Sequence, residues 1–187
     1  MALISIELEQ LGQWLQDIGG EFRGHLHAIL KQAADVSRVI YQISHDLHPS
    51  KLTQLGLVAA VKGLCHDLEG SHALRIEFVD EGVPADLPQD ISLCLYRIVQ
   101  ECLNNVIKHS GAEEAEVELL GTGKEVRLSI SDSGTGFDIE SPRIRKGLGL
   151  VSMRERLRLV GGSISIDSKL SMGTQIHARV PLREKRP

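Results

Sequence analysis

The stretch SDSGTGF at residues 131–137 decides the fold of this chain. It follows a run of alternating apolar residues and therefore lies where a predicted strand ends. Aspartate, serine and glycine are common in turns, so the stretch alone predicts only a turn. Two further motifs add to it, because a helical pattern ending in ECLNNVIKHS (101–110) lies upstream and GLGL (147–150) lies downstream. This order indicates one site built from a helix, a strand end and a loop.

Asp132, Gly134 and Gly136 suit the recognition of a purine base. A carboxylate at a strand end can accept a hydrogen bond from the exocyclic amino group of the base. The glycines let the backbone pass where a Cβ atom would collide with the ring. On the predicted helix, Glu101 and Asn105 are four residues apart and share a face. A carboxamide there can hold a magnesium ion that carries phosphates, so the motifs predict a pocket for ATP.

Each motif also has a plain structural explanation. The polar helix face can be a solvated face whose basic end, residues 108–109, suits the negative end of the helix dipole. Gly147 and Gly149 can form a hinge, or present backbone N–H groups to a phosphate at a helix start. Gly173 before Thr174 can be a turn glycine, or can bring a hydroxyl to the base pocket. The combination of motifs in this order favours the pocket.

Hydrophobic periodicity predicts an α+β domain preceded by a helical hairpin. Helices are expected at residues 2–17, 22–48, 55–68, 86–111 and 149–160. Strands are expected at residues 74–79, 115–120, 126–132, 163–167 and 174–182. Helices segregated from a mostly antiparallel sheet predict a two-layer α/β sandwich with the helices on one face. Two exposed helices leave an apolar seam open, so the hairpin favours a homodimer that completes a four-helix bundle.

Composition narrows the class of protein. A formal net charge of -4 and 3% aromatic residues argue against a nucleic-acid-binding surface. The sequence contains no run of 18 or more apolar residues and therefore predicts no membrane span. Membrane attachment is expected only through regions outside this chain. Cys65, Cys94 and Cys102 fall in apolar helical patterns, as buried free thiols do. Free thiols favour a reducing, cytoplasmic location.

The motifs resemble the N, G1, G2 and G3 boxes of the GHKL (Bergerat) ATPase domain shared by gyrase B, heat-shock protein 90, sensor histidine kinases and MutL. The resemblance covers roughly residues 90–182 and implies ATP and Mg²⁺ as cofactors. It makes Asn105 the magnesium ligand and Asp132 the adenine contact. It makes Glu101 the catalytic carboxylate, at the acidic position that assists metal or water chemistry in relatives. The remaining ATP-binding residues that it implies are Asn104, Lys108, His109, Gly134, Gly136, Gly147, Leu148, Gly149 and Thr174.

The front half is similar to sensor histidine kinases that work with response regulators of the NarL and LuxR type. ISHDLHP (43–49) and LGLVAA (55–60) resemble their second dimerisation helix and linker, and YRIVQE (96–101) also matches. This similarity implies three parts, which are a partial dimerisation and phosphotransfer hairpin at 1–52, a linker helix at 53–70 and a catalytic domain at 71–187. The function implied is Mg-ATP-dependent phosphoryl transfer to a histidine and onward to a response-regulator aspartate.

The acceptor histidine is where the chain departs from that subgroup. There it lies in a His-Asp or His-Glu pair on the first helix, upstream of a segment that residues 2–10 resemble. No such pair precedes Met1, so we expect this chain not to autophosphorylate. His45 with Asp46 mimics the pair, but its place shortly before Pro49 favours a polar helix end.

Two other functions stay open. One is an ATP hydrolase of the gyrase or chaperone kind, in which Glu101 activates water. The other is a dimeric scaffold that binds nucleotide without turnover, or a phosphatase that acts on the regulator. Substantial ATP hydrolysis would favour the first, and nucleotide affinity without a phosphoprotein would favour the second.

Overall fold

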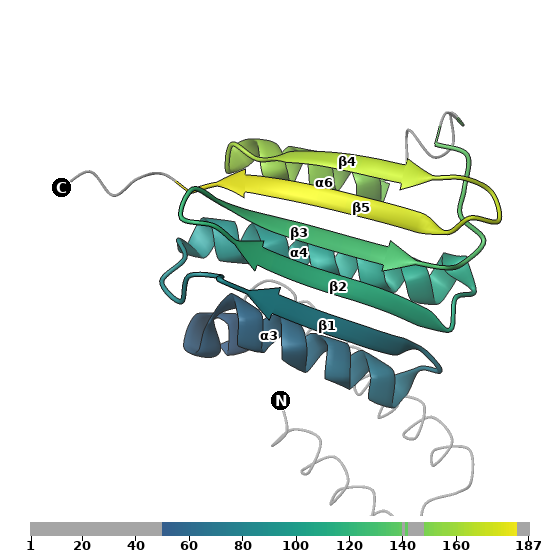
Figure 1. Ribbon diagram of the computed structural model, residues 1–187, viewed down its shortest axis with the longest axis horizontal. Coiled ribbons are helices and arrows are strands. Elements are labelled where there is room, and N and C mark those ends of the chain that lie inside the picture. The colour runs from purple at the N-terminus through teal and green to yellow at the C-terminus, as the bar shows by residue number, and fades with distance from the viewer. Residues whose placement is uncertain (1–49, 140, 142–147, 183–187) are drawn as a thin grey trace, which may run out of the picture. The chain divides into compact units, whose positions relative to one another are not determined.

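The computed structural model describes residues 50–139, 141 and 148–182, so the predicted helices at 2–17 and 22–48 lie outside the described residues. The described part is a five-stranded sheet with helices packed on one face (Figure 1). The strand order is β1-β2-β3-β5-β4, in which β1 and β2 are parallel and the other neighbours are antiparallel. This arrangement confirms the predicted α+β sandwich.

The predicted strands all form, each within two residues of its expected ends. They are β1 (Arg75–Glu81), β2 (Glu114–Gly121), β3 (Glu125–Asp132), β4 (Ser163–Ser168) and β5 (Thr174–Pro181). The described helices are α3 (Ser50–Ser71), α4 (Gln89–Asn105), the π-helical turn η1 (Val106–Ser110) and α6 (Leu148–Leu159). The helix α3 is longer than predicted, and Gly56 interrupts its helical backbone with a φ of 80°.

Alternation along β2 and β3 explains why the helices cover only one face of the sheet. Val117 and Leu119 on β2, and Leu128 and Ile130 on β3, are buried, while their chain neighbours are more exposed. Successive side chains along a strand point to opposite faces of the sheet, so the buried residues lie on the face that packs against the helices. A hairpin can join β2 to the antiparallel β3, whereas the parallel pair β1 and β2 needs a crossover, which α4 supplies.

The end of α4 differs from the sequence prediction of one continuous helix to residue 111. Ile91, Leu95, Ile98 and Cys102 form its buried face at helical spacing. Beyond Asn105 the chain widens into the π-helical turn η1, and the left-handed Gly111 ends it with a φ of 64°. Hydrophobic spacing does not distinguish a π turn from an α turn at a helix end. Such turns are frequent at functional sites.

The helix α3 contributes to the same core as the sheet. Its buried apolar residues are Leu52, Leu57, Ala60, Val61 and Cys65. Cys65, Cys94 and Cys102 are all buried free thiols, as predicted. Burial raises the pKa of the Cys65 thiol to about 12 and that of Cys94 to about 11. None of the helices in the described part of the chain has the length and hydrophobicity that a membrane span requires.

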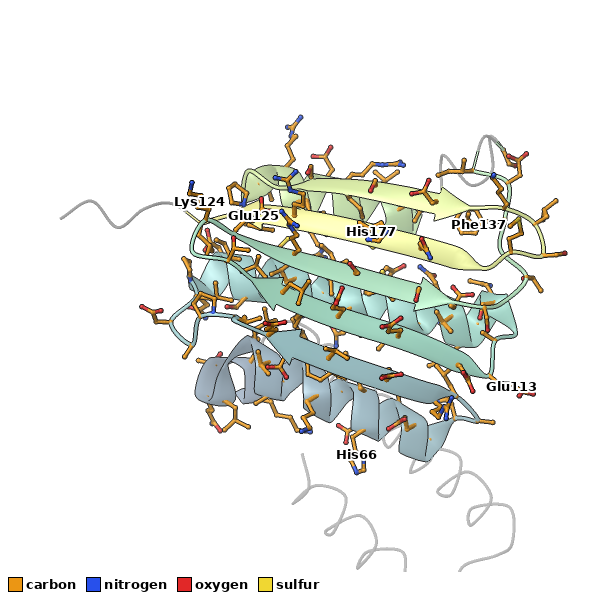
Figure 2. The ribbon with its side chains drawn as sticks, in the orientation of Figure 1. His66, Glu113, Lys124, Glu125, Phe137 and His177 are labelled. Atoms are coloured by element: carbon orange, nitrogen blue, oxygen red, sulfur yellow. The ribbon has the colours of Figure 1, made fainter. Side chains whose placement is uncertain are left out.

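The opposite face of the sheet carries polar side chains, among them His177 and Glu125 (Figure 2). Glu125 accepts hydrogen bonds from Nη2 of Arg179 at 2.6 Å and from Nε of Arg127 at 2.5 Å. These bonds hold the pKa of the Glu125 carboxyl below its ordinary value. The carboxylate lies between two arginines that face each other across β3 and β5, so it offsets their repulsion.

Candidate functional site

A cavity of about 670 Å³ is bounded by the end of α4, η1, the ends of β3 and β5, and the start of α6. Nine of the predicted site residues line it: Glu101, Asn104, Asn105, Lys108, His109, Asp132, Gly136, Gly149 and Thr174. Segments far apart in the sequence thus meet at one hollow of a size suited to a small-molecule ligand.

Three predicted site residues, and the alternative acceptor histidine, are not among the described residues that line the cavity. Gly134 borders the cavity, because its backbone N–H donates to the lining residue Asp132. Leu148 is the first residue of α6. Gly147 and His45 lie outside the described residues.

Sequence reasoning missed part of the lining: Cys102, Val106, Ser110, Ile130, Thr135, Phe137, Leu150 and Ile176. Ile130 and Ile176 face each other across β3 and β5, two residues before and after the paired Asp132 and Thr174. Because side chains two residues apart share a face, strand alternation could have identified this apolar pair. No comparable signal marked Thr135 and Phe137 of the loop or Ser110 of η1.

Asp132 ends β3 at the wall of the cavity. Its side chain is half-buried, and its Oδ1 accepts a hydrogen bond from the backbone N–H of Gly134 at 2.8 Å. Burial raises the pKa of the Asp132 carboxyl, and the Gly134 hydrogen bond partly opposes this shift. The second carboxylate oxygen can accept a hydrogen bond from a ligand.

The loop after Asp132 is held closely against the end of η1. The backbone N–H of Thr135 donates to the carbonyl oxygen of Ser110 at 2.8 Å. A Cβ atom added at Gly134 would lie 2.6 Å from Cβ of Ser110. This close approach requires glycine at position 134 and places the loop backbone at the edge of the cavity.

The polar face of α4 meets the start of α6 at Glu101. A Cβ atom added at Gly149 would collide with the Glu101 carboxylate, so this carboxylate lies close to the glycine backbone. Asn105 lies one turn further along α4, with Lys108 exposed on η1. The carboxylate and carboxamide oxygens are of the kind that Mg²⁺ prefers, so Glu101 and Asn105 fit a magnesium site.

Residues 90–184 match the family model described as histidine kinase-, DNA gyrase B-, and HSP90-like ATPase. The chain belongs to this ATPase family. Its ATP-binding domain is the one that the boxes resemble, so the match confirms the GHKL resemblance.

Among relatives of this ATPase, the sensor histidine kinase MctS of Rhizobium johnstonii is 35% identical over 150 residues. The matched region covers 79% of this chain and 32% of MctS, so the chain spans about a third of the length of that relative. The ATPase domain is therefore homologous to that of a sensor histidine kinase.

Solved structures show the same fold. The histidine kinase domain from the Erythrobacter litoralis EL346 blue-light activated histidine kinase aligns with a TM-score of 0.61 at 16% identity, over 97% of this chain and 96% of that one. A longer structure of EL346 aligns with a TM-score of 0.59 at 17% identity, over 90% of this chain and 66% of that one.

Proposed function

We propose that this chain is the catalytic core of a two-component sensor histidine kinase. In this proposal it uses Mg-ATP to phosphorylate a histidine, and the phosphoryl group then passes to an aspartate of a response regulator of the NarL or LuxR type. It works in the cytoplasm as a homodimer, with residues 1–52 as the dimerisation hairpin, 53–70 as the linker and 71–187 as the catalytic domain. The observation that carries the proposal is the joint placement of Asp132, Asn105 and Lys108 around one cavity.

Each of these groups has a distinct task in the proposed site. Asp132 accepts a hydrogen bond from the amino group of adenine, and Thr174 lies beside it. Lys108 and His109 on η1 lie on the phosphate side, together with the backbone at Gly149. Asn105, with Glu101 beside it, would hold Mg²⁺, which when bound neutralises charge on the phosphates. Catalysis then rests on positioning and electrostatics.

The first test is the dependence of ATP affinity on magnesium. Calorimetric titration with ATP is expected to show a higher affinity with Mg²⁺ than with a chelator. Asn105→Ala is expected to lower the Mg²⁺-dependent gain by at least about tenfold, because the ion loses an oxygen ligand. Gln89→Ala is the control, since it removes an exposed carboxamide at the other end of α4. An unchanged gain in folded Asn105→Ala would exclude Asn105 as the ligand.

Transfer chemistry requires a separate test. The chain is incubated with γ-labelled ATP and with a second chain that carries a dimerisation hairpin and its acceptor histidine. Acid-labile label on the second chain is the expected result, because phosphohistidine hydrolyses in acid. Release of free phosphate alone would favour the hydrolase alternative, with Glu101 activating water.

The ionisation of Asp132 gives the site a pH dependence. Burial raises the pKa of this carboxyl, so it protonates above the ordinary aspartate value of about 3.9. Protonation removes an acceptor, and ATP affinity is therefore expected to fall as the pH falls through the raised pKa.

The folding stability changes in the opposite direction. The folded state binds this proton more readily than the unfolded chain, so the contribution of Asp132 to the free energy of unfolding weakens as pH rises. Carbon-13 NMR titration of the carboxyl measures the pKa, and a value at or below 3.9 would contradict this prediction.

A further inference from the structure

Three polar residues form a row across the sheet at the base end of the cavity. Asp132 on β3 pairs with Thr174 on β5, and Thr174 pairs with Ser168 on β4. Paired residues of neighbouring strands point to the same face of a sheet, so all three side chains lie on the face that carries the cavity. Asp132 and Thr174 line the cavity, whereas Ser168, which lies on β4 next to Thr174, is not among the lining residues that the structure describes.

The hydroxyl of Ser168 has three hydrogen-bond partners. Its Oγ accepts from the backbone N–H of Phe137 at 2.9 Å, on the segment labelled in Figure 2 beside the end of β4. It also lies 3.0 Å from the carbonyl oxygen of Gly173 and 3.0 Å from Oγ1 of Thr174. A carbonyl has no proton, so the contact with Gly173 is a hydrogen bond only if Ser168 donates its single proton there.

This assignment determines the role of the Thr174 hydroxyl. Because the Ser168 proton points to Gly173, Thr174 must donate its own proton to Ser168 for all three contacts to be hydrogen bonds. Thr174 then presents only lone pairs to the cavity. The Asp132 carboxylate beside it is also an acceptor, so both of these side chains accept hydrogen bonds and neither offers a donor.

We propose that Ser168 is a specificity-determining positioning residue, which holds the Thr174 hydroxyl as an acceptor and so selects a 6-aminopurine over a 6-oxopurine. The amino group of a 6-aminopurine has two N–H bonds and can donate to both acceptors, whereas a 6-oxopurine presents a lone-pair oxygen and only the single N1–H donor on this edge. The inference rests on the proposed nucleotide function and assigns to Ser168 an effect exerted through Thr174, without contact with the base.

The test compares ATP with ITP, whose base carries an oxo group at position 6 and a hydrogen on N1. Wild-type protein is expected to bind ATP more tightly in calorimetric titration. Ser168→Ala frees the Thr174 proton to turn toward the ligand, so the ATP to ITP affinity ratio is expected to fall about five- to tenfold, the effect of one hydrogen bond. Ser168→Thr keeps the hydroxyl and is expected to keep the ratio. Ser165→Ala is the control, since Ser165 lies exposed on the same strand.

A double-mutant comparison separates positioning from general loss of structure. In a Thr174→Val background, Ser168→Ala is expected to change the ratio no further, because the hydroxyl on which it acts is gone. Equal weakening of ATP and ITP by Ser168→Ala would overturn the inference, as would a ratio that Ser168→Ala leaves unchanged. If Ser168→Ala does not fold, Thr174→Val alone must lower the ratio. Wild-type protein that binds neither nucleotide would overturn the proposed function itself.

Discussion

Asp132→Ala is expected to weaken ATP binding by about 10- to 100-fold, the loss typical of a hydrogen bond to a charged group. The substitution removes the carboxylate that faces the cavity and leaves the amino group of adenine without its acceptor. It also removes the acceptor of the Gly134 N–H, which the structure places 2.8 Å from Oδ1. The loop that borders the cavity therefore loses an anchor together with the contact to the base.

Calorimetric titration with Mg-ATP measures this effect, and Asp167→Ala is the matched control. The Asp167 side chain is exposed on β4, so removal of its carboxylate is expected to leave the ATP affinity unchanged. Asp132→Asn removes the charge and replaces one acceptor oxygen with an NH2 donor, so it is expected to keep a hydrogen bond to Gly134 or to the base but not to both. A folded Asp132→Ala variant with wild-type affinity would show that adenine does not lie against this residue.

Gly173→Ala is expected to lower the free energy of unfolding by about 2–5 kcal/mol. Gly173 has a φ of 73°, in the left-handed region, which costs other L-residues roughly 1–2 kcal/mol. An added Cβ atom would also collide with the carbonyl oxygen of Asp132 and lie 3.1 Å from Cα of Ser133. Because these neighbours are backbone atoms, the end of β3 must move. Overpacking of this kind costs a further free energy of about 1–3 kcal/mol.

Urea denaturation of Gly173→Ala measures the loss, with Gly111→Ala as the control. Gly111 has a similar φ of 64°, but nothing lies within 4 Å of a Cβ atom added there. The control therefore reports the backbone strain alone, and the difference between the two variants reports the collision. Equal losses would mean that the β3 end relaxes without cost. The collision also predicts weaker ATP binding by folded Gly173→Ala, since Asp132 is displaced.

The amino-acid sequence predicts the layers of the fold and most of the motif residues that line the cavity. Alternation in β2 and β3 and helical spacing in α4 each arise from neighbours along the chain, so the pattern of apolar residues reveals them directly. The motif residues Asp132, Asn105 and Gly149 were identifiable because the order of the boxes is itself a sequence property. The cavity that they line agrees with this expectation.

The contacts between these residues could not be predicted from the sequence, because they form only in the folded chain. The row of Asp132, Thr174 and Ser168 depends on which strands pair and in which register. The approach of Glu101 to Gly149 depends on how α4 packs beside α6. Hydrogen bonds between residues distant in sequence leave no periodic pattern in the amino-acid sequence. A serine that orients a threonine therefore cannot be distinguished, from the sequence, from any other serine at a strand end. The direction of the Thr174 proton follows from three partners that meet only when the sheet and the loop are folded together.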